Sequence, residues 1–275
     1  MSLLKRAKSF QTKKALGQNF LVDESFLERI EKAIDWSNTL EILEIGSGIG
    51  FLTERLVKHH LPVYALDFDA EALMRIPGAK NLIKINADAL RFDFESLPTP
   101  LTVVGNLPFN IGTLILIRLL GEITQSDWAV PGIKEMVLMF QKELAERLCA
   151  EPGSRAYNPL SILVQAKAEV TYLFDVPAQS FHPVPKVAAG VVRLIPRQEN
   201  PLRDLTLQEL ESLSGILKTA FNQKRKMIRN SLMEFFSNQD LKACNILPEL
   251  RAERLSLGDY INLTKYYHQR QNDGF

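Results

Sequence analysis

Residues 39–50 read Thr-Leu-Glu-Ile-Leu-Glu-Ile-Gly-Ser-Gly-Ile-Gly, and they decide the fold. The first eight residues form a short β-rich run that ends at Gly46. Two further glycines follow at alternate positions, where a strand is expected to turn into a helix. Glycine has no Cβ, so the backbone of such a turn can approach a ligand closely. The alternative is a tight strand-to-helix turn that binds nothing.

The same alternation continues outward from this stretch. Further strands are predicted over residues 63–67, 81–87, 101–108, 134–140, 160–177 and 186–197. Helical stretches are predicted over 25–35, where Ser25 can cap, and over 50–60, 69–75 and 111–120. Strands that alternate with helices predict an α/β fold with a doubly wound parallel sheet, whose ligand sites lie at the carboxyl ends of the strands. The last two runs flank a proline-rich turn at 181–185 and are expected to complete a mixed sheet.

From about residue 200 the sequence changes to helical periodicity. A chain of 275 residues is long enough for one large core and a smaller one. We therefore predict an α/β domain over residues 1–198 and a small all-helical domain over residues 199–275.

The composition is that of an ordinary soluble protein, with 46% hydrophobic and 24% charged residues. We see no signal peptide and no apolar run that could span a membrane, so we expect a cytoplasmic protein. Cys149 and Cys244 lack metal-ligand spacing, and we expect neither a disulfide nor a metal site. The first 22 residues carry five basic and no acidic side chains, which indicates either a polyanion contact or a solvated terminus.

The spacing of the glycines excludes two common phosphate-binding loops. A dinucleotide fingerprint needs a third glycine at position 51, which is Phe51, and a P-loop needs a following Gly-Lys-Ser/Thr. Asp67 ends the second strand of the series, where a carboxylate can accept bonds from ribose hydroxyls. Asp88 follows the third, where it can accept a bond from an adenine amine. Each alone is as readily a helix cap or turn former. Together with the glycines they predict an adenosine site without phosphates, which suits S-adenosylmethionine.

Asn106-Leu107-Pro108-Phe109 follows the buried run 101–105. The adenine N6 amine is a poor nucleophile because its lone pair is delocalised into the ring. The side-chain carbonyl of Asn106 and the backbone carbonyl of Leu107 can each accept an N6–H bond and so localise that pair. Pro108 stiffens the turn, and Phe109 offers a face on which an extruded base can stack. The alternative is an ordinary turn with a core phenylalanine.

These segments resemble the ribosomal RNA adenine N6-dimethyltransferases, in particular the bacterial small-subunit branch linked to kasugamycin sensitivity. The matching segments run in order along nearly the whole chain: LGQNFL (16–21), LEIGSGIGFLT (43–53), LDFD (66–69), ADAL (87–90), GNLPFNI (105–111), FQKELAERL (140–148), SFHPVPKV (180–187) and FNQKRKMIRNSL (221–232). The resemblance implies a Rossmann-like class I methyltransferase domain. It also implies S-adenosylmethionine-dependent dimethylation of two adjacent adenosines near the 3′ end of small-subunit ribosomal RNA.

The resemblance further implies roles for single residues. Cofactor contacts are implied for Asn19, Leu21, Gly46, Asp67, Asp88 and Asn106. Phe181 is implied to stack on the target base opposite Phe109, although a phenylalanine before a proline-rich turn is more often a core anchor. The family more often has Glu, Tyr and Pro where this chain has Asp67, Phe109 and Ser47. The shorter Asp67 suggests a longer or water-bridged ribose contact.

Basic side chains are the expected contacts for RNA phosphates. The candidates are Lys13, Lys14, Lys224, Arg225, Lys226 and Arg229, with a solvated helix face as the alternative. By family analogy the helical domain docks on a pre-ribosomal particle, and we expect a monomer. Three rival functions remain: methylation of a large-subunit adenosine, methylation of DNA adenine, and a catalytically silent assembly factor.

Overall fold

The computed structural model describes residues 2–223 and 225–272, which pack into two compact units. The first comprises the residues up to Leu119 together with Val130–Glu146 and Glu169–Pro196. The second comprises Leu120–Ala129, Arg147–Ala168 and the residues from Arg197 onward. No helix in the described ranges is long and apolar enough to cross a membrane. The described residues also contain no group of three or more His, Cys, Asp or Glu side chains placed to hold a metal ion.

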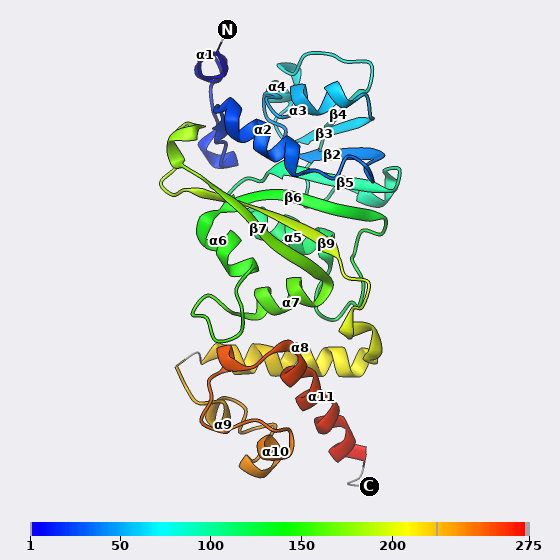
Figure 1. The fold of residues 1–275 in the computed structure, drawn as a ribbon, viewed down its shortest axis with the longest axis vertical. Helices are drawn as coiled ribbons and strands as arrows, with labels where there is room; N and C mark the ends of the chain where they lie inside the picture. The colour runs from blue at the N-terminus through cyan, green and yellow to red at the C-terminus, as the bar shows by residue number, and fades with distance from the viewer. Residues whose placement is uncertain (1, 224, 273–275) are drawn as a thin grey trace. The chain divides into compact units, whose positions relative to one another are not determined.

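A seven-stranded sheet, in the order β4-β3-β2-β5-β6-β9-β7, forms the centre of the first unit (Figure 1). The strands β4, β3, β2, β5 and β6 are parallel, and β9 runs antiparallel to β6. The mixed, mostly parallel α/β sheet predicted from the alternating pattern is thus confirmed. The strand bounds are β2 (Glu41–Ile45), β3 (Val63–Asp67), β4 (Leu82–Asn86), β5 (Leu101–Asn106), β6 (Ile133–Gln141), β7 (Ala168–Val176) and β9 (Ala189–Pro196).

Helices lie where the sequence predicts them: α2 (Glu24–Ala33) precedes β2, and α3 (Thr53–Leu56), α4 (Ala70–Met74) and α5 (Gly112–Leu120) follow β2, β3 and β5. The cap of α2 is Asp23 rather than Ser25, because the Asp23 carboxylate accepts the Ser25 backbone N–H. Leu27 and Ile30 of α2 are buried in one apolar cluster with sheet residues such as Val104. Two further helices are α1 (Leu3–Lys8) and α6 (Lys142–Leu148).

The strand predicted over residues 160–177 is wrong in its first half. Helix α7 (Pro159–Lys167) occupies that half, and β7 begins only at Ala168. Asn158 caps the helix in a reciprocal box with Ser161, and Pro159 lies at its first position. Because α7 is buried on several sides, its apolar run has no amphipathic period, and a short run of that kind cannot be told from a buried strand.

The sequence did not predict a second, small sheet. Strand β1 (Phe20–Leu21) pairs antiparallel with β8 (Phe181–His182), with Leu21 opposite Phe181. This pairing joins the segment before α2 to the proline-rich turn. It therefore brings two of the matched family segments, 16–21 and 180–187, side by side.

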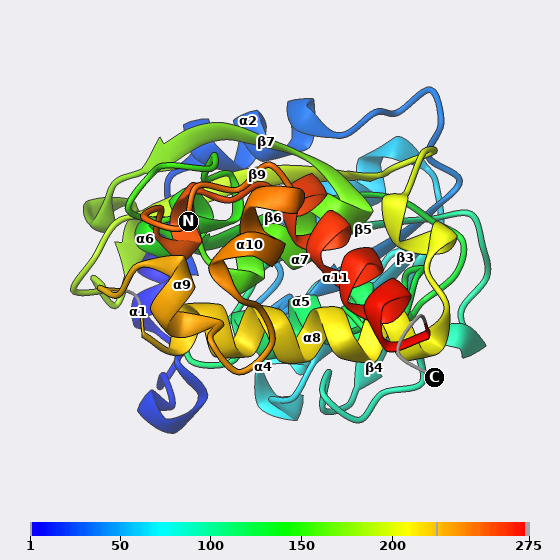
Figure 2. The same ribbon diagram turned by 90° about the horizontal axis from the view of Figure 1, so that it is seen from below.

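The second unit contains the C-terminal helices α8 (Leu207–Asn222), α9 (Ile228–Ser231), α10 (Asn238–Ala243) and α11 (Leu257–Asn272), of which α8 and α11 pack together (Figure 2). Their shared core includes Leu213, Ile216 and the fully buried Tyr260, whose hydroxyl donates to the Ala252 carbonyl. Lys167 is also buried here and donates to three backbone carbonyls of the segment 120–129. The domain boundary between residues 198 and 199, expected from the sequence, stays a prediction. Short 3-10 helices cover Lys14–Leu16, Val57–His59, Phe94–Ser96, Ala178–Ser180, Pro201–Asp204 and Ala252–Arg254.

Candidate active site

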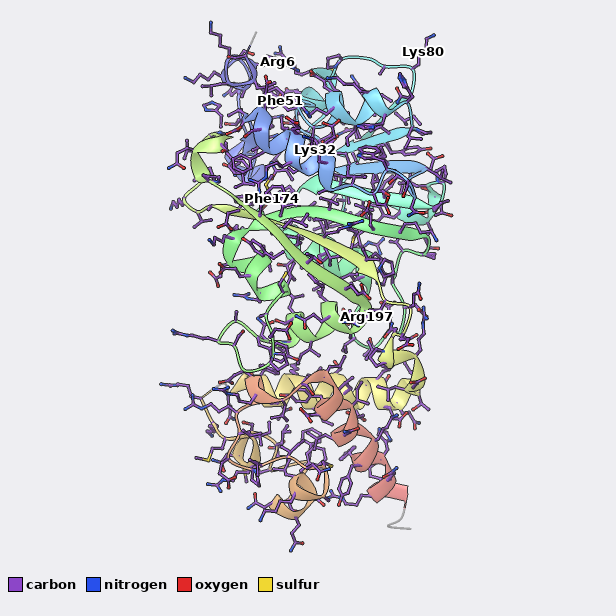
Figure 3. The ribbon with its side chains drawn as sticks, viewed as in Figure 1. Arg6, Lys32, Phe51, Lys80, Phe174 and Arg197 are labelled. Carbon is purple, nitrogen blue, oxygen red and sulfur yellow. The ribbon has the colours of Figure 1, made fainter. Side chains whose placement is uncertain are left out.

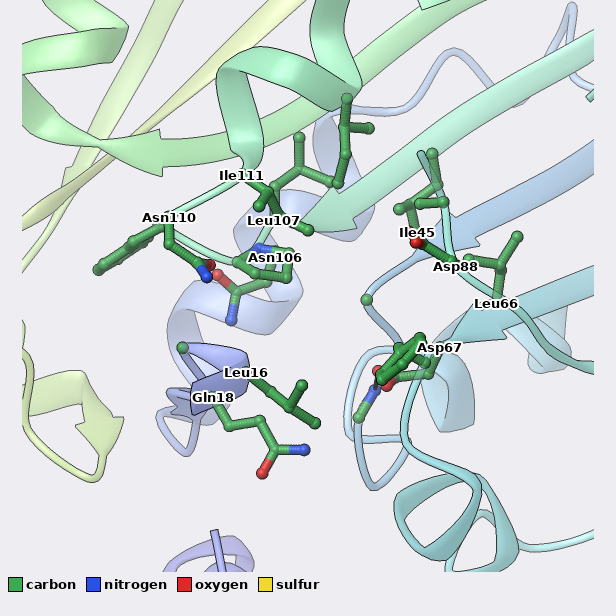
Figure 4. A pocket seen from close by; sticks show the side chains of 18 of the residues that line it. Leu16, Gln18, Ile45, Leu66, Asp67, Asp88, Asn106, Leu107, Asn110 and Ile111 are labelled. Atoms are coloured by element: carbon green, nitrogen blue, oxygen red, sulfur yellow. Dashed lines mark hydrogen bonds between the residues drawn. The ribbon is translucent and has the colours of Figure 1, made fainter. Parts of the chain in front are cut away.

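The parallel strands bring their carboxyl ends to one edge of the sheet, where a pocket of about 270 Å³ lies. Ile45 pairs with Leu66, and Asp67 pairs with Asn86, so the turns after these strands are neighbours. Asn106 lies on one side of the pocket, and Asp67 and Asp88 lie on the other (Figure 4). The predicted residues that line it are Asn19, Gly46, Asp67, Asp88, Asn106, Leu107, Pro108 and Phe109.

The glycine turn after β2 is required by its backbone and by its close neighbours. Gly46 and Gly48 have φ of +76° and +53°, a region that residues with a Cβ rarely adopt. A Cβ on Gly46 would lie 3.0 Å from the Asn106 carbonyl oxygen, and one on Gly48 would lie 2.8 Å from the Phe20 ring. Both predictions for this segment therefore hold, since it is a tight strand-to-helix turn and it also lines the pocket.

Backbone bonds fix the Asp67 carboxylate in place. One oxygen accepts the Gly48 N–H at 2.7 Å, and the other accepts the Asp69 N–H at 2.8 Å. Burial raises the pKa of Asp67, these backbone bonds oppose the rise, and the nearby Asp69 charge adds to it. Each carboxylate oxygen keeps one lone pair, so the two oxygens together can accept bonds from two neighbouring hydroxyls.

Glu44 lies beneath the glycine turn and is only 2% exposed. Burial raises the pKa of Glu44 to about 8; the bond from the Thr53 hydroxyl, at 2.5 Å, opposes the rise, and the Asp67 charge adds to it. The side chain is therefore mostly protonated at neutral pH. Glu44 was not among the residues predicted from the sequence, although a glutamate within an apolar strand run indicates a buried polar group.

Asp88 combines the two roles that the sequence left open. Its carboxylate accepts the Leu90 N–H at 2.9 Å, as a turn former does, and it also lines the pocket. The side chain is 34% exposed, with Arg91 3.9 Å away. The Arg91 contact is to the second oxygen, Oδ2, which accepts no hydrogen bond from the residues that the structure describes.

The side chain of Asn106 is oriented by the segment before α2. Its Nδ2 donates to the Asn19 carbonyl at 2.9 Å, which leaves Oδ1 as the acceptor available at the pocket. Among the described residues, nothing donates a hydrogen bond to the Leu107 carbonyl oxygen. The Pro108 carbonyl accepts the Ile111 N–H at 3.1 Å and closes the turn into α5. Two carbonyl acceptors from consecutive residues are therefore available at one turn.

The rings of Phe109 and Phe181 meet edge to face, with centroids 6.3 Å apart and planes at 68°. Phe181 is 1% exposed and is held by the pairing of β8 with β1. A base stacked on the faces of both rings would need them to separate and turn. The stacking role of Phe181 stays a prediction, and in this conformation it is a core anchor.

Leu21 and Phe68 differ in how they lie at the site. Leu21 is not part of the main pocket's lining, but it lines a smaller cavity with Glu44, Gly46 and Asn106. Phe68 directly follows Asp67, is 61% exposed and lines the main pocket. Phe68 was not among the residues predicted from the sequence, although an aromatic residue next to a predicted ribose acid indicates a stacking contact. An exposed ring at this place can stack on an adenine.

The basic residues predicted to bind RNA have different surroundings. Lys13 is bonded to Asp69 and Glu71 at 2.8 and 2.9 Å, and its side chain is 42% exposed. Arg225 and Lys226 are exposed, and Arg229 pairs with Glu249 at 3.3 Å. Lys224 and the side chain of Lys14 lie outside the described residues. All six phosphate contacts stay predictions.

Comparison with known proteins finds relatives that cover most of the chain. The model of the family "Ribosomal RNA adenine dimethylase" matches residues 9–269. The ribosomal RNA small subunit methyltransferase A of Thiobacillus denitrificans is 40% identical over 263 residues, covering 94% of this chain and 98% of the relative. That of Aromatoleum aromaticum is 38% identical over 259 residues, covering 93% and 94%.

Solved structures give the same result for the fold. A dimethyladenosine transferase from Plasmodium falciparum has a TM-score of 0.72 at 26% identity, covering 90% of this chain and 97% of that one. The 23S rRNA methyltransferase ErmE has a TM-score of 0.70 at 23% identity, covering 91% and 100%, and shows the fold alone. The chain belongs to the ribosomal RNA adenine dimethylase family of methyltransferases.

Proposed function

We propose that this protein uses S-adenosylmethionine to dimethylate the N6 amines of two adjacent adenosines near the 3′ end of small-subunit ribosomal RNA. The observation that carries the proposal is the turn after β5. There the Asn106 amide is held by Asn19 so that its oxygen is the acceptor at the pocket, beside the Leu107 carbonyl.

The pocket fits an adenosine that carries a positive charge rather than a phosphate. Its described lining contains the carboxylates of Asp67 and Asp88 and no Lys or Arg side chain. Asp67 has lone pairs for both ribose hydroxyls, Asp88 has one for the adenine amine, and Phe68 offers a stacking face. A sulfonium cofactor matches this acidic and aromatic lining, whereas a nucleotide phosphate would be repelled.

The bound cofactor supplies an electrophilic methyl group on a sulfonium sulfur. Asn106 Oδ1 and the Leu107 carbonyl each accept an N6–H bond, which pulls the nitrogen toward tetrahedral geometry and localises its lone pair. Both carbonyl dipoles also stabilise the positive charge that develops on this nitrogen. Phe109 holds the extruded base by stacking. After transfer the ammonium proton is acidic enough for water to take it, so no side chain is needed as a general base.

Recognition of the RNA rests on phosphate contacts and on the shape of the particle. We assign the phosphate contacts to Lys13, Lys14, Lys224, Arg225, Lys226 and Arg229. In this proposal the domain 199–275 docks on a pre-ribosomal particle, and the enzyme acts as a monomer in the cytoplasm.

The test is methyl transfer from labelled S-adenosylmethionine to unmodified small subunits, large subunits or adenine-containing DNA. We expect label in the small subunit alone, as dimethyladenosine at two adjacent positions. Label in the large subunit or in DNA would support one of the rival substrates. Binding of the particle without any label would support a silent assembly factor.

A further inference from the structure

Asp69 joins three parts of the first unit although it lies outside the described pocket lining. One oxygen accepts the Lys13 ammonium at 2.8 Å and the Glu71 N–H at 3.1 Å, which caps α4. The other accepts the side-chain amide of Gln18 at 2.7 Å. The backbone N–H of Asp69 donates to Asp67, the proposed ribose acid. Its side chain is 1% exposed.

The partners Lys13 and Gln18 belong to one segment, residues 13–20, which we name the N-terminal strap. The Lys13 N–H donates to the Gln18 side-chain oxygen at 2.8 Å and closes the strap on itself. Residues 15–20 of the strap line the pocket, and Leu16 and Gln18 are drawn at its side in Figure 4. The strap is held along its length: Asp69 binds Lys13 at its start and Gln18 further on, the Asn106 amide binds the Asn19 carbonyl, and Phe20 pairs with His182.

The contact between Lys13 and Asp69 differs from an ordinary surface ion pair on the Asp69 side, because Asp69 is 1% exposed whereas Lys13 is 42% exposed. The Asp69 carboxylate is almost completely withdrawn from water. In such an environment charge-assisted hydrogen bonds gain strength, and an unpaired charge is costly. Burial alone would raise the pKa of Asp69, but the bonds from Lys13 and Gln18 outweigh it and lower that pKa. The strap thus keeps Asp69 ionised, and Asp69 keeps the strap in place.

We propose that Lys13 and Asp69 form a latch that holds the N-terminal strap closed against bound S-adenosylmethionine, and that both are positioning residues for the cofactor. The inference rests on the proposed function, which places the cofactor in this pocket. Because the strap forms one wall, releasing its start opens the pocket while the bond between Asn106 and Asn19 still holds the other end. The latch therefore controls how fast the cofactor leaves more than how fast the methyl group is transferred.

The matched control is a second ion pair near the N-terminus. Arg6 of α1 bonds to Glu54 and lies over the Phe51 ring at 4.9 Å (Figure 3). None of these residues lines the main pocket. Arg6→Met therefore removes an N-terminal ion pair without touching the latch. Lys13→Met removes the charged bond of the latch, leaves the bond from Gln18 to Asp69 in place and keeps most of the side-chain length. Lys13→Arg keeps the positive charge and should therefore keep the contact with Asp69.

The first measurement is the dissociation rate of S-adenosylmethionine from the full chain. Lys13→Met should dissociate about three- to tenfold faster, since the bond it removes is charge-assisted but partly exposed. The loss of activity should lie mainly in cofactor KM rather than in kcat. Lys13→Arg and Arg6→Met should stay close to wild type. An unchanged dissociation rate for Lys13→Met, with only RNA affinity reduced, would overturn the latch and leave Lys13 with the proposed phosphate contact alone.

The second measurement is amide hydrogen exchange of residues 15–20 without cofactor. Faster exchange in Lys13→Met but not in Arg6→Met supports the latch, and equal exchange in the two variants overturns it. This readout separates the two proposals. If the wild-type protein binds no S-adenosylmethionine, the proposed function fails, while the exchange result still decides whether Lys13 holds the strap.

Discussion

The carboxyl edge of the sheet and the basic segment 225–229 hold their polar side chains in opposite ways. At the edge, Asp67 accepts two backbone N–H groups and Asn106 donates to a backbone carbonyl, so both are fixed before a ligand arrives. In the basic segment, Arg225 and Lys226 are exposed, and neither forms an ion pair within residues 2–223 and 225–272. Fixed dipoles can stabilise a transition state without reorganising, whereas exposed surface cations supply affinity that salt weakens. Changes at the edge should therefore alter rate, cofactor affinity or pH response, and changes in the segment should alter RNA affinity.

The largest effect is expected for Asn106→Ala. Removing one preorganised polar group from a catalytic site lowers the rate on the order of 10²-fold, because the N6 lone pair is no longer localised. Single-turnover methylation of unmodified small subunits at saturating cofactor measures this. Phe109→Tyr is the control and should stay active because it keeps the stacking face. A near-normal rate for Asn106→Ala would break the contrast between the two regions and refute the mechanism.

Glu44→Gln tests how the buried acid at the carboxyl edge makes the free energy of unfolding depend on pH. The pKa of Glu44 is raised from 4.5 to about 8, so its stabilising contribution is complete below pH 4.5 and is lost as the pH rises toward 8. The loss approaches at most about 1.4 kcal/mol per pH unit. Denaturant unfolding between pH 5 and 8 should show a smaller decline for Glu44→Gln than for wild type. Parallel profiles for the two proteins would contradict the buried, neutral Glu44, and the exposed Glu28→Gln serves as the control.

Asp67→Ala and Asp88→Ala compare how much the two carboxylates at the carboxyl edge contribute to cofactor affinity. Each removes a charged acceptor, and we expect S-adenosylmethionine affinity to fall about tenfold or more, with the larger fall for Asp67 because two ribose bonds disappear. Calorimetry measures the affinity. Asp93→Ala is the matched control, since Asp93 accepts a backbone N–H two residues on, as Asp88 does, but does not line the pocket. Wild-type affinity in both edge variants would remove the cofactor assignment.

The smallest effect is expected from the basic segment. Replacing Lys224, Arg225 and Lys226 with Gln should lower RNA affinity severalfold and flatten its salt dependence, by roughly 0.7–0.9 in slope for each phosphate that is no longer neutralised. Filter binding over a range of salt concentrations measures both quantities, with the exposed Lys80→Gln as the control. An unchanged slope would make the segment an ordinary solvated surface.

Most of the sheet and much of the candidate site were predictable because their signals are local. The strand ends at Asp67 and Asn106 and the glycines between 46 and 50 depend on periodicity and on turn chemistry, which neighbouring residues specify. The error at 160–167 has the same origin. A helix buried on several sides and a buried strand both appear as a continuous apolar run, and only the packing decides between them.

The sequence by itself therefore determined the α/β class, the succession of strands in the main sheet and the set of polar residues at their ends. The tertiary structure alone decided which groups those residues contact. Lys13, predicted as a phosphate contact, is bonded to Asp69, a residue 56 positions away. Asn106 is oriented by the carbonyl of Asn19, 87 positions away. Such contacts leave no local pattern, because they depend on how distant segments are brought together, and that is fixed by burial of apolar surface over the whole unit rather than by the residues that meet.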